Sequence, residues 1–154
     1  AVHLSPFLGA LYRPNERIFY HGFLEVDVPL NGNTLLYDPG TDPVRIGLLT
    51  EQTLLKVDVS AGRWLYRNPH AYVTGLASIV EFHYTSTLND GDALYVGADR
   101  FGNLLNRFDL AHLTVGLHAR ILENTTLRVG GVFPLNDVDR AFDAEVQVSL
   151  NRYF

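Results

Sequence analysis

The sequence contains no cysteine, no methionine and a single lysine, Lys56. Without cysteine there is no disulfide framework, no thiolate zinc site and no cysteine nucleophile. Charged residues make up 19% of the chain, below the roughly 25% of ordinary soluble domains. The net charge of −5 and the scarcity of lysine argue against a nucleic-acid-binding surface. The composition therefore predicts a weakly ionic surface and no nucleic-acid partner.

Long apolar runs are also missing, since no stretch approaches the roughly 18 residues of a transmembrane helix. The sequence shows no signal peptide and does not start with methionine, so we expect a processed or truncated chain. Any contact with a membrane would have to be made by strands.

The sequence does contain a recurrent alternation of apolar and polar residues, with the period of two that is typical of a β-strand with one apolar face. The clearest example is residues 142–154. Similar alternation covers residues 17–30, 53–66, 71–88, 111–122 and 126–135. Residues 3–13 are apolar on both faces and make a further strand. The pattern predicts about seven strands and no helix.

The connections between these strands alternate between tight and longer ones. The tight ones are residues 13–17, 67–70 and 123–126, and the longer ones are residues 31–52, 89–107 and 135–141. In an antiparallel meander this places all tight turns at one rim, which is the asymmetry of a transmembrane β-barrel. The predicted fold is therefore all-β, an antiparallel up-and-down transmembrane barrel. Residues 1–154 form one domain or its C-terminal portion, with outer loops at about 31–52 and 89–107.

The polar register decides which face points outward. A soluble barrel of the lipocalin kind turns its apolar face inward around a ligand. Here small residues alternate with long charged ones in the polar register, which suits a crowded lumen better than a solvated exterior. Aromatic residues fall near strand ends, where membrane interfaces collect them. The membrane interpretation is favoured.

In that interpretation the lumen contains a polar network. Its members are Lys56, Asp58, Glu81, His83, His118, Arg120, Arg128 and Glu145. We expect ion pairs between neighbouring strands, because an unpaired charge in a narrow lumen is costly. Lys56 and Asp58 are expected to face Glu81 and His83. Arg120 and Arg128 are expected to lie on neighbouring strands, with Glu145 following.

The last strand, "FDAEVQVSLNRYF", resembles the terminal strand of Gram-negative outer-membrane β-barrel proteins. In that family the assembly machinery reads alternating apolar positions that end in an aromatic residue. The matching positions here are Val146, Val148, Leu150 and Phe154, whereas Arg152 and Tyr153 depart from the pattern. Residues 76–88 and 113–135 are similar to planctomycete-type barrels. The resemblance implies an outer-membrane location, with the lipid bilayer and the barrel assembly machinery as partners.

The expected strand number is odd, whereas single-chain bacterial barrels have an even number. Either residues 31–52 hide extra pairing, or the chain is the C-terminal part of a larger porin- or transporter-type barrel. In the second case a missing N-terminal segment or other chains would complete it.

Few residues suggest chemistry. Glu81 and His83 share one strand face, about 7 Å apart, as in a lipid-modifying hydrolase, but Ser86 lies in the opposite register and Thr85 would be an unusual nucleophile. Asp90, Asp92 and Asp99 are weak calcium candidates that match no EF-hand, and a solvated acidic loop is the favoured interpretation. His112 and His118 lack metal-ligand spacing. We expect no enzyme, no metal and no cofactor.

The predicted function is a channel or transport pore with a polar, mixed-charge lumen. One alternative is a plugged structural or binding barrel whose function resides in its outer loops. Strand number separates these two, because about 8 strands leave an interior filled by side chains and 16 to 18 leave water. The other alternative is a soluble, lipocalin-like ligand-binding barrel, which would need no detergent.

Overall fold

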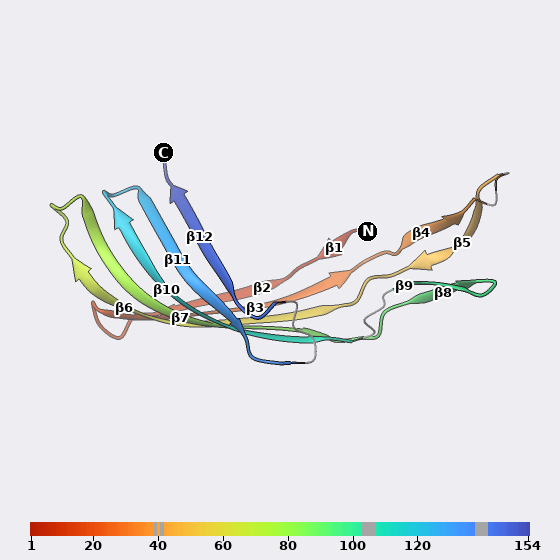
Figure 1. The fold of residues 1–154 in the computed structure, drawn as a ribbon, viewed down its shortest axis with the longest axis horizontal. Coiled ribbons are helices and arrows are strands. Elements are labelled where there is room, and N and C mark those ends of the chain that lie inside the picture. The colour runs from red at the N-terminus through yellow and green to blue at the C-terminus, as the bar shows by residue number, and fades with distance from the viewer. Residues whose placement is uncertain (39, 41, 103–106, 138–141) are drawn as a thin grey trace. The chain divides into compact units, whose positions relative to one another are not determined.

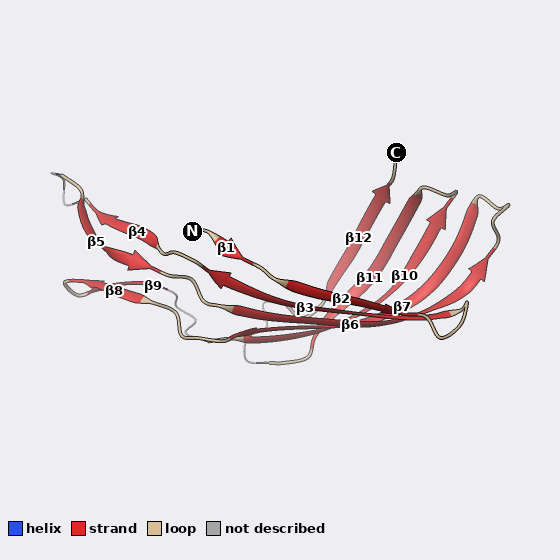
Figure 2. Ribbon diagram, turned by 180° about the vertical axis from the view of Figure 1, so that it is seen from behind, coloured by secondary structure: helices blue, strands red, loops and turns tan. Residues whose placement is uncertain are grey.

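The computed structural model describes residues 1–38, 40, 42–102, 107–137 and 142–154. All regular secondary structure in these ranges is β-strand, as Figure 2 shows. The described residues include no helix long and apolar enough to cross a membrane. The prediction of an all-β fold is confirmed.

The described residues contain twelve strands, labelled in Figure 1. They are β1 (His3–Leu4), β2 (Phe7–Tyr12), β3 (Ile18–Pro29), β4 (Asn33–Tyr37), β5 (Val44–Leu49), β6 (Leu54–Arg67), β7 (Val73–Thr87), β8 (Ala93–Val96), β9 (Asp99–Gly102), β10 (Asp109–Ile121), β11 (Thr125–Pro134) and β12 (Glu145–Arg152).

The largest sheet follows the chain order β1-β3-β6-β7-β10-β11-β12, and β2 also pairs with β3. Its registered pairs β1–β3, β10–β11 and β11–β12 are antiparallel. Because β1 and β2 both pair with β3, these two strands occupy a single position in the sheet. The path therefore has as many positions as the predicted strands. In the described residues β1 and β12 end this path without pairing to each other, so the expected closed barrel is not observed.

The tight turns form at the predicted places and use asparagine side chains. Asn15 Oδ1 accepts hydrogen bonds from the backbone N–H groups of Arg17 (2.9 Å) and Ile18 (2.8 Å), between β2 and β3. Asn68 Oδ1 accepts one from His70 N–H at 3.0 Å, between β6 and β7. Such local bonds are the reason asparagine favours turns. Between β10 and β11, Leu122 adopts a φ of 53°.

The two long predicted loops each contain a hairpin. Strands β4 and β5 pair within residues 31–52, and β8 and β9 pair within residues 89–107. Residues 39, 41 and 103–106 of these loops lie outside the described residues. The extra pairing anticipated in residues 31–52 therefore exists, but these hairpins form separate two-stranded sheets and add no strand to the large one.

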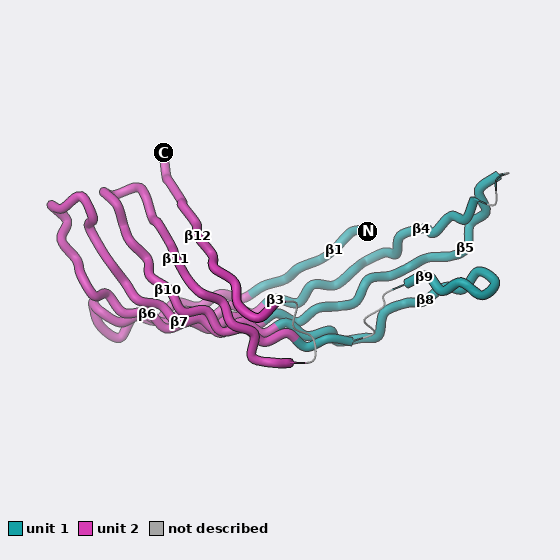
Figure 3. The backbone as a smooth tube through the Cα atoms, in the orientation of Figure 1, with its two compact units in different colours: residues 1–7, 25–56, 85–109 teal, residues 8–24, 57–84, 110–154 magenta. Residues whose placement is uncertain are grey.

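The chain divides into two compact units, coloured in Figure 3. Unit 1 comprises residues 1–7, 25–56 and 85–109, and unit 2 comprises residues 8–24, 57–84 and 110–154. Unit 1 contains both hairpins. Unit 2 contains the tight turns together with β10 to β12 except for the first residue of β10.

The two faces of the sheet in unit 2 differ sharply in chemistry and burial. On one face, Leu117, Val129 and Val148 lie side by side across β10, β11 and β12. On the other face, His118, Arg128 and Ser149 do the same. The predicted alternation of the two registers is confirmed in these strands.

Burial in unit 2 differs between the two faces. Large apolar side chains of the first face are open, with Leu117 48% and Val148 66% exposed. The buried positions of unit 2 include Ser60 and Ala77 of the polar register, at 4% and 1% exposure. Ile79 and Val132 of the same register are also buried, at 3% and 5% exposure, so the buried residues of unit 2 lie on the polar face and the apolar face is uncovered.

Candidate functional site

The polar face is the candidate functional surface, and its first ion pairs lie in unit 1. Lys56 Nζ is 2.8 Å from Glu25 Oε1 and 3.9 Å from Asp27 Oδ2, both on β3. Asp27 Oδ1 also accepts a hydrogen bond from Ser5 Oγ at 3.1 Å and lies 2.9 Å from His3 Nδ1. Both of these carboxylates lie on β3, whereas the sequence predicted Glu81 and His83 on β7 as the neighbours of Lys56.

A second polar cluster joins β6 and β7 in unit 2. His83 Nδ1 is 2.6 Å from Asp58 Oδ1, and His83 Nε2 is 3.8 Å from Glu81 Oε2. The expected pairing of Asp58 with His83 is confirmed. Since both ring nitrogens face carboxylates, His83 is poorly placed to take a proton from Thr85 or Ser86. The arrangement supports a polar network more than a hydrolase site.

The remaining members of the predicted network lie on β10 to β12. His118 is directly opposite Arg128, and Arg128 is directly opposite Ser149. Glu145 is opposite Val132, farther along β11, and its Oε1 accepts a hydrogen bond from Gln147 at 3.1 Å. The register therefore does not bring Glu145 beside Arg128.

Arg120 belongs to a different cluster, in which two arginines lie over one tryptophan. The Cζ atoms of Arg67 and Arg120 are 5.5 Å and 5.3 Å from the centroid of the Trp64 ring. Arg67 Nη1 also donates to the carbonyl of Glu16 at 3.2 Å. These are distances at which a guanidinium is attracted to the face of an indole.

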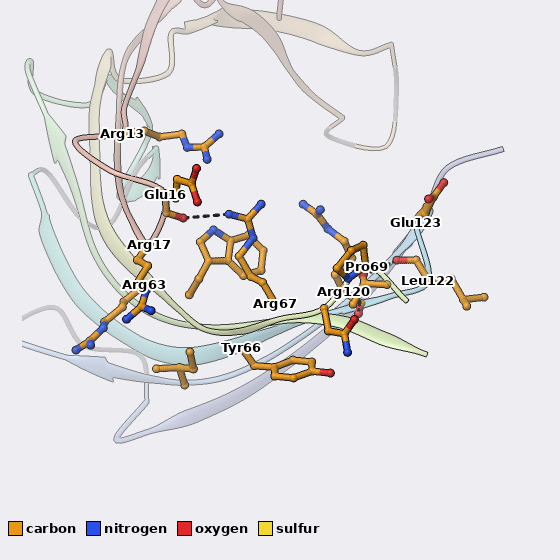
Figure 4. A pocket seen from close by; sticks show the side chains of 14 residues that line it. Arg13, Glu16, Arg17, Arg63, Tyr66, Arg67, Pro69, Arg120, Leu122 and Glu123 are labelled. Atoms are coloured by element: carbon orange, nitrogen blue, oxygen red, sulfur yellow. Dashed lines mark hydrogen bonds between the residues drawn. The ribbon is translucent and has the colours of Figure 1, made fainter. Parts of the chain in front are cut away.

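This cluster borders a cavity of about 910 Å³ within unit 2 (Figure 4). Its charged lining residues are Arg13, Glu16, Arg17, Arg63, Arg67, Arg120 and Glu123. Figure 4 shows Arg13, Glu16, Arg67 and Arg120 on the inner side of the curved strands. The guanidinium groups on this inner side outnumber the Glu16 carboxylate beside them, so the cavity has an excess of positive charge.

Glycines allow the aromatic rings of this cluster to lie close to the sheet. A Cβ on Gly75 would be 2.7 Å from Trp64 Cζ3, and a Cβ on Gly62 would clash with the Phe19 ring. Phe19 and Trp64 also contact each other, with ring centroids 6.0 Å apart. Any larger residue at either glycine would displace a ring.

Two of the three acidic residues considered for calcium already have other hydrogen-bond or ion-pair partners. Asp90 pairs with Arg107 at 2.6 Å, and Asp92 Oδ2 accepts the N–H of Thr50 at 2.9 Å, while Asp99 begins β9. Within the described ranges, no three histidine or acidic side chains gather as metal ligands.

Three of the four residues predicted as an assembly signal lie on the exposed edge strand β12. Val146, Val148 and Leu150 are 76%, 66% and 67% exposed. Phe154 follows the strand with its ring fully exposed, and Arg152 Cζ lies 5.4 Å from that ring. The three aliphatic residues occupy the apolar register of β12.

Sequence reasoning did not single out the arginine and tryptophan cluster. The position of Trp64 near a strand end is also that of a membrane-interface aromatic residue, as predicted for the aromatic residues in general. Its register, shared with Ser60 and Gly62 on the polar face, was the signal that could have placed it beside the charged residues.

Comparison of the chain with protein-family models, with curated proteins and with solved structures gives no match.

Proposed function

We propose that this chain forms part of a transmembrane β-barrel in a Gram-negative outer membrane, and that the barrel is a channel or transport pore. The observation that carries the proposal is the reversed burial of the two faces. Leu117, Val129 and Val148 form an uncovered apolar row, while the polar register holds the ion pairs. A lipid bilayer is the natural partner of such an apolar face.

The polar face supports the pore part of the proposal. Lys56 with Glu25, and Asp58 with His83, place both charge signs on the surface that would face the lumen. Their side chains retain 19% to 42% exposure, which is compatible with contact with water. Paired charges of both signs would let hydrated solutes pass without a large electrostatic barrier.

The edges of the sheet support a larger assembly. In a bilayer every backbone N–H and C=O group must be satisfied within the protein, so an open edge is not tolerated. In the described residues β12 pairs with β11 alone. We therefore propose that strands from a further segment of the protein, or from other chains, pair with β12 and with β1 and β2.

The barrel assembly machinery is the second proposed partner. Val146, Val148 and Leu150 present alternate apolar side chains along an edge strand. An exposed strand edge of this kind pairs readily with another strand. Insertion would then begin from β12.

The experiment is to express the full-length protein in Gram-negative cells, fractionate the membranes and reconstitute the purified barrel in planar bilayers. We expect extraction only by detergent, and discrete conductance steps. Neutralising Arg120 and Arg128 to glutamine should shift ion selectivity toward cations. Arg152→Gln, on the opposite register, is the matched control. Recovery in the soluble fraction, or a membrane protein without conductance, would contradict the pore.

A further inference from the structure

The cavity beside Trp64 contains more positive charge than the surrounding carboxylates neutralise. Among the described residues, the only arginine in an ion pair is Arg107, which lies in unit 1. Arg13, Arg67 and Arg120 on the inner side of the cavity are therefore not within ion-pair distance of a described carboxylate, although Glu16 and Glu123 are in the same lining. Such a concentration of like charge is relieved by an anion.

The two arginines closest to the tryptophan are held in place by contacts that leave donors free. Each guanidinium has five N–H donors in a planar fork. Arg67 and Arg120 are held by packing against the Trp64 ring. Arg67 also donates one hydrogen bond from its guanidinium group to the carbonyl of Glu16. The other donors remain available for a ligand.

Trp64 is itself fixed, so the arginines rest on a rigid platform. Its backbone N–H donates to the carbonyl of Arg17 at 2.8 Å. Its ring lies against Gly75 and contacts Phe19. A preorganised pair of guanidiniums loses less side-chain entropy when it binds an anion than two mobile arginines would.

We propose that this cavity is a binding site for a phosphate group, held by Arg67 and Arg120 with help from Arg13. A phosphate has several oxygens that can accept hydrogen bonds from more than one guanidinium group at once. A carboxylate has only two oxygens and is less suited to bridging two arginines. The volume of about 910 Å³ leaves space for the molecule that carries the phosphate. The site lies within unit 2 and goes beyond the pore function.

The test uses the fluorescence of Trp64, the only tryptophan in the chain. The detergent-solubilised full-length protein is titrated with inorganic phosphate at constant ionic strength, with chloride as the reference anion, while equilibrium dialysis with radiolabelled phosphate measures binding directly. We expect saturable binding that chloride does not reproduce. Arg67→Gln and Arg120→Gln should each weaken it by about tenfold or more.

The controls separate loss of the site from loss of the fold. Arg152→Gln removes a guanidinium that lies over another aromatic ring of unit 2, Phe154, and should leave binding unchanged. Arg13→Gln changes a residue in a tight turn and should weaken binding without affecting folding, which circular dichroism checks for every variant. Unchanged binding in folded Arg67→Gln and Arg120→Gln proteins would overturn the proposal.

Two further titrations identify the source of the phosphate. Glycerol 3-phosphate represents a soluble ester, and micelles containing phosphatidic acid represent a lipid headgroup. Binding of either supports the site and assigns its ligand class. No saturable response to any of the phosphate compounds would refute it. Since binding is measured in detergent, the result does not depend on whether the protein conducts ions.

Discussion

The indole ring of Trp64 on β6 lies directly against Gly75 on the neighbouring strand β7, where a side chain would leave it no room. A Cβ built on Gly75 would come within 2.7 Å of Trp64 Cζ3. Trp64 also contacts Phe19 on β3. The Trp64 ring therefore links β3, β6 and β7.

Replacing Gly75 by alanine should therefore displace the Trp64 ring. We expect Gly75→Ala to lower the free energy of unfolding by about 1 to 3 kcal/mol, as overpacking typically does, and to shift the tryptophan emission maximum. Gly22→Ala is the matched control, because its Cβ would meet Asp58 O at an ordinary 3.8 Å. Equal effects of the two substitutions in urea titrations would show that the Trp64 contact is not responsible.

A pair of adjacent substitutions tests which face contacts lipid. Val148 belongs to the apolar row and Ser149 to the polar row of the same strand. A lysine at mid-membrane on the lipid face costs about 2 to 4 kcal/mol, so Val148→Lys should reduce the amount of heat-modifiable barrel in isolated outer membranes. Ser149→Lys should have little effect, since its side chain would enter the lumen.

The effect of Val148→Lys on folding without a membrane separates the membrane barrel from a soluble one. If the apolar face enclosed a ligand in a soluble barrel, Val148→Lys would impair folding in the absence of any membrane. The two lysine variants are therefore also compared after refolding in detergent and after refolding in buffer alone. Folding of wild-type protein in buffer alone would contradict the membrane assignment.

The alternation of residue types was enough to predict which residues share a face. Leu117, Val129 and Val148 each fall on the apolar side of the alternation in the sequence, and the pairing of β10, β11 and β12 places them in one row. A period of two fixes the face of each side chain once a stretch is known to be a strand. The antiparallel order followed from the alternation of tight turns and longer connections.

The choice of partner could not be predicted in the same way. Each strand inside a sheet has two neighbours, and alternation does not say which neighbour a side chain contacts or how far the strands are offset. Lys56 therefore pairs with Glu25 on β3, whereas Asp58, two residues later on the same face, pairs with His83 on β7. Glu145 lies opposite Val132 for the same reason.

The strength of the ion pair between Lys56 and Glu25 reports how far water reaches the polar face. Their side chains are 35% and 19% exposed, and partly exposed pairs typically couple by about 0.2 to 1 kcal/mol. A double-mutant cycle with Lys56→Met and Glu25→Gln, measured by urea unfolding in detergent, should give a coupling in that range. A coupling of about 3 kcal/mol or more would indicate a dry, plugged interior. The exposed pair of Arg107 and Asp90 is the reference.

The last prediction concerns Phe154, whose ring is fully exposed and contacts Arg152 in the described structure. Because an exposed ring contributes little to stability, Phe154→Ala should change the unfolding of folded barrel in detergent by less than about 0.5 kcal/mol. If the assembly machinery recognises this residue together with Val146, Val148 and Leu150, the same substitution should sharply lower barrel levels in outer membranes.

Tyr153→Ala is the control, because Tyr153 is also exposed but lies in the other register. Its backbone N–H donates to Asn124 O at 2.9 Å, a bond that the substitution leaves in place. Equal membrane levels of the two variants would remove Phe154 from the assembly signal.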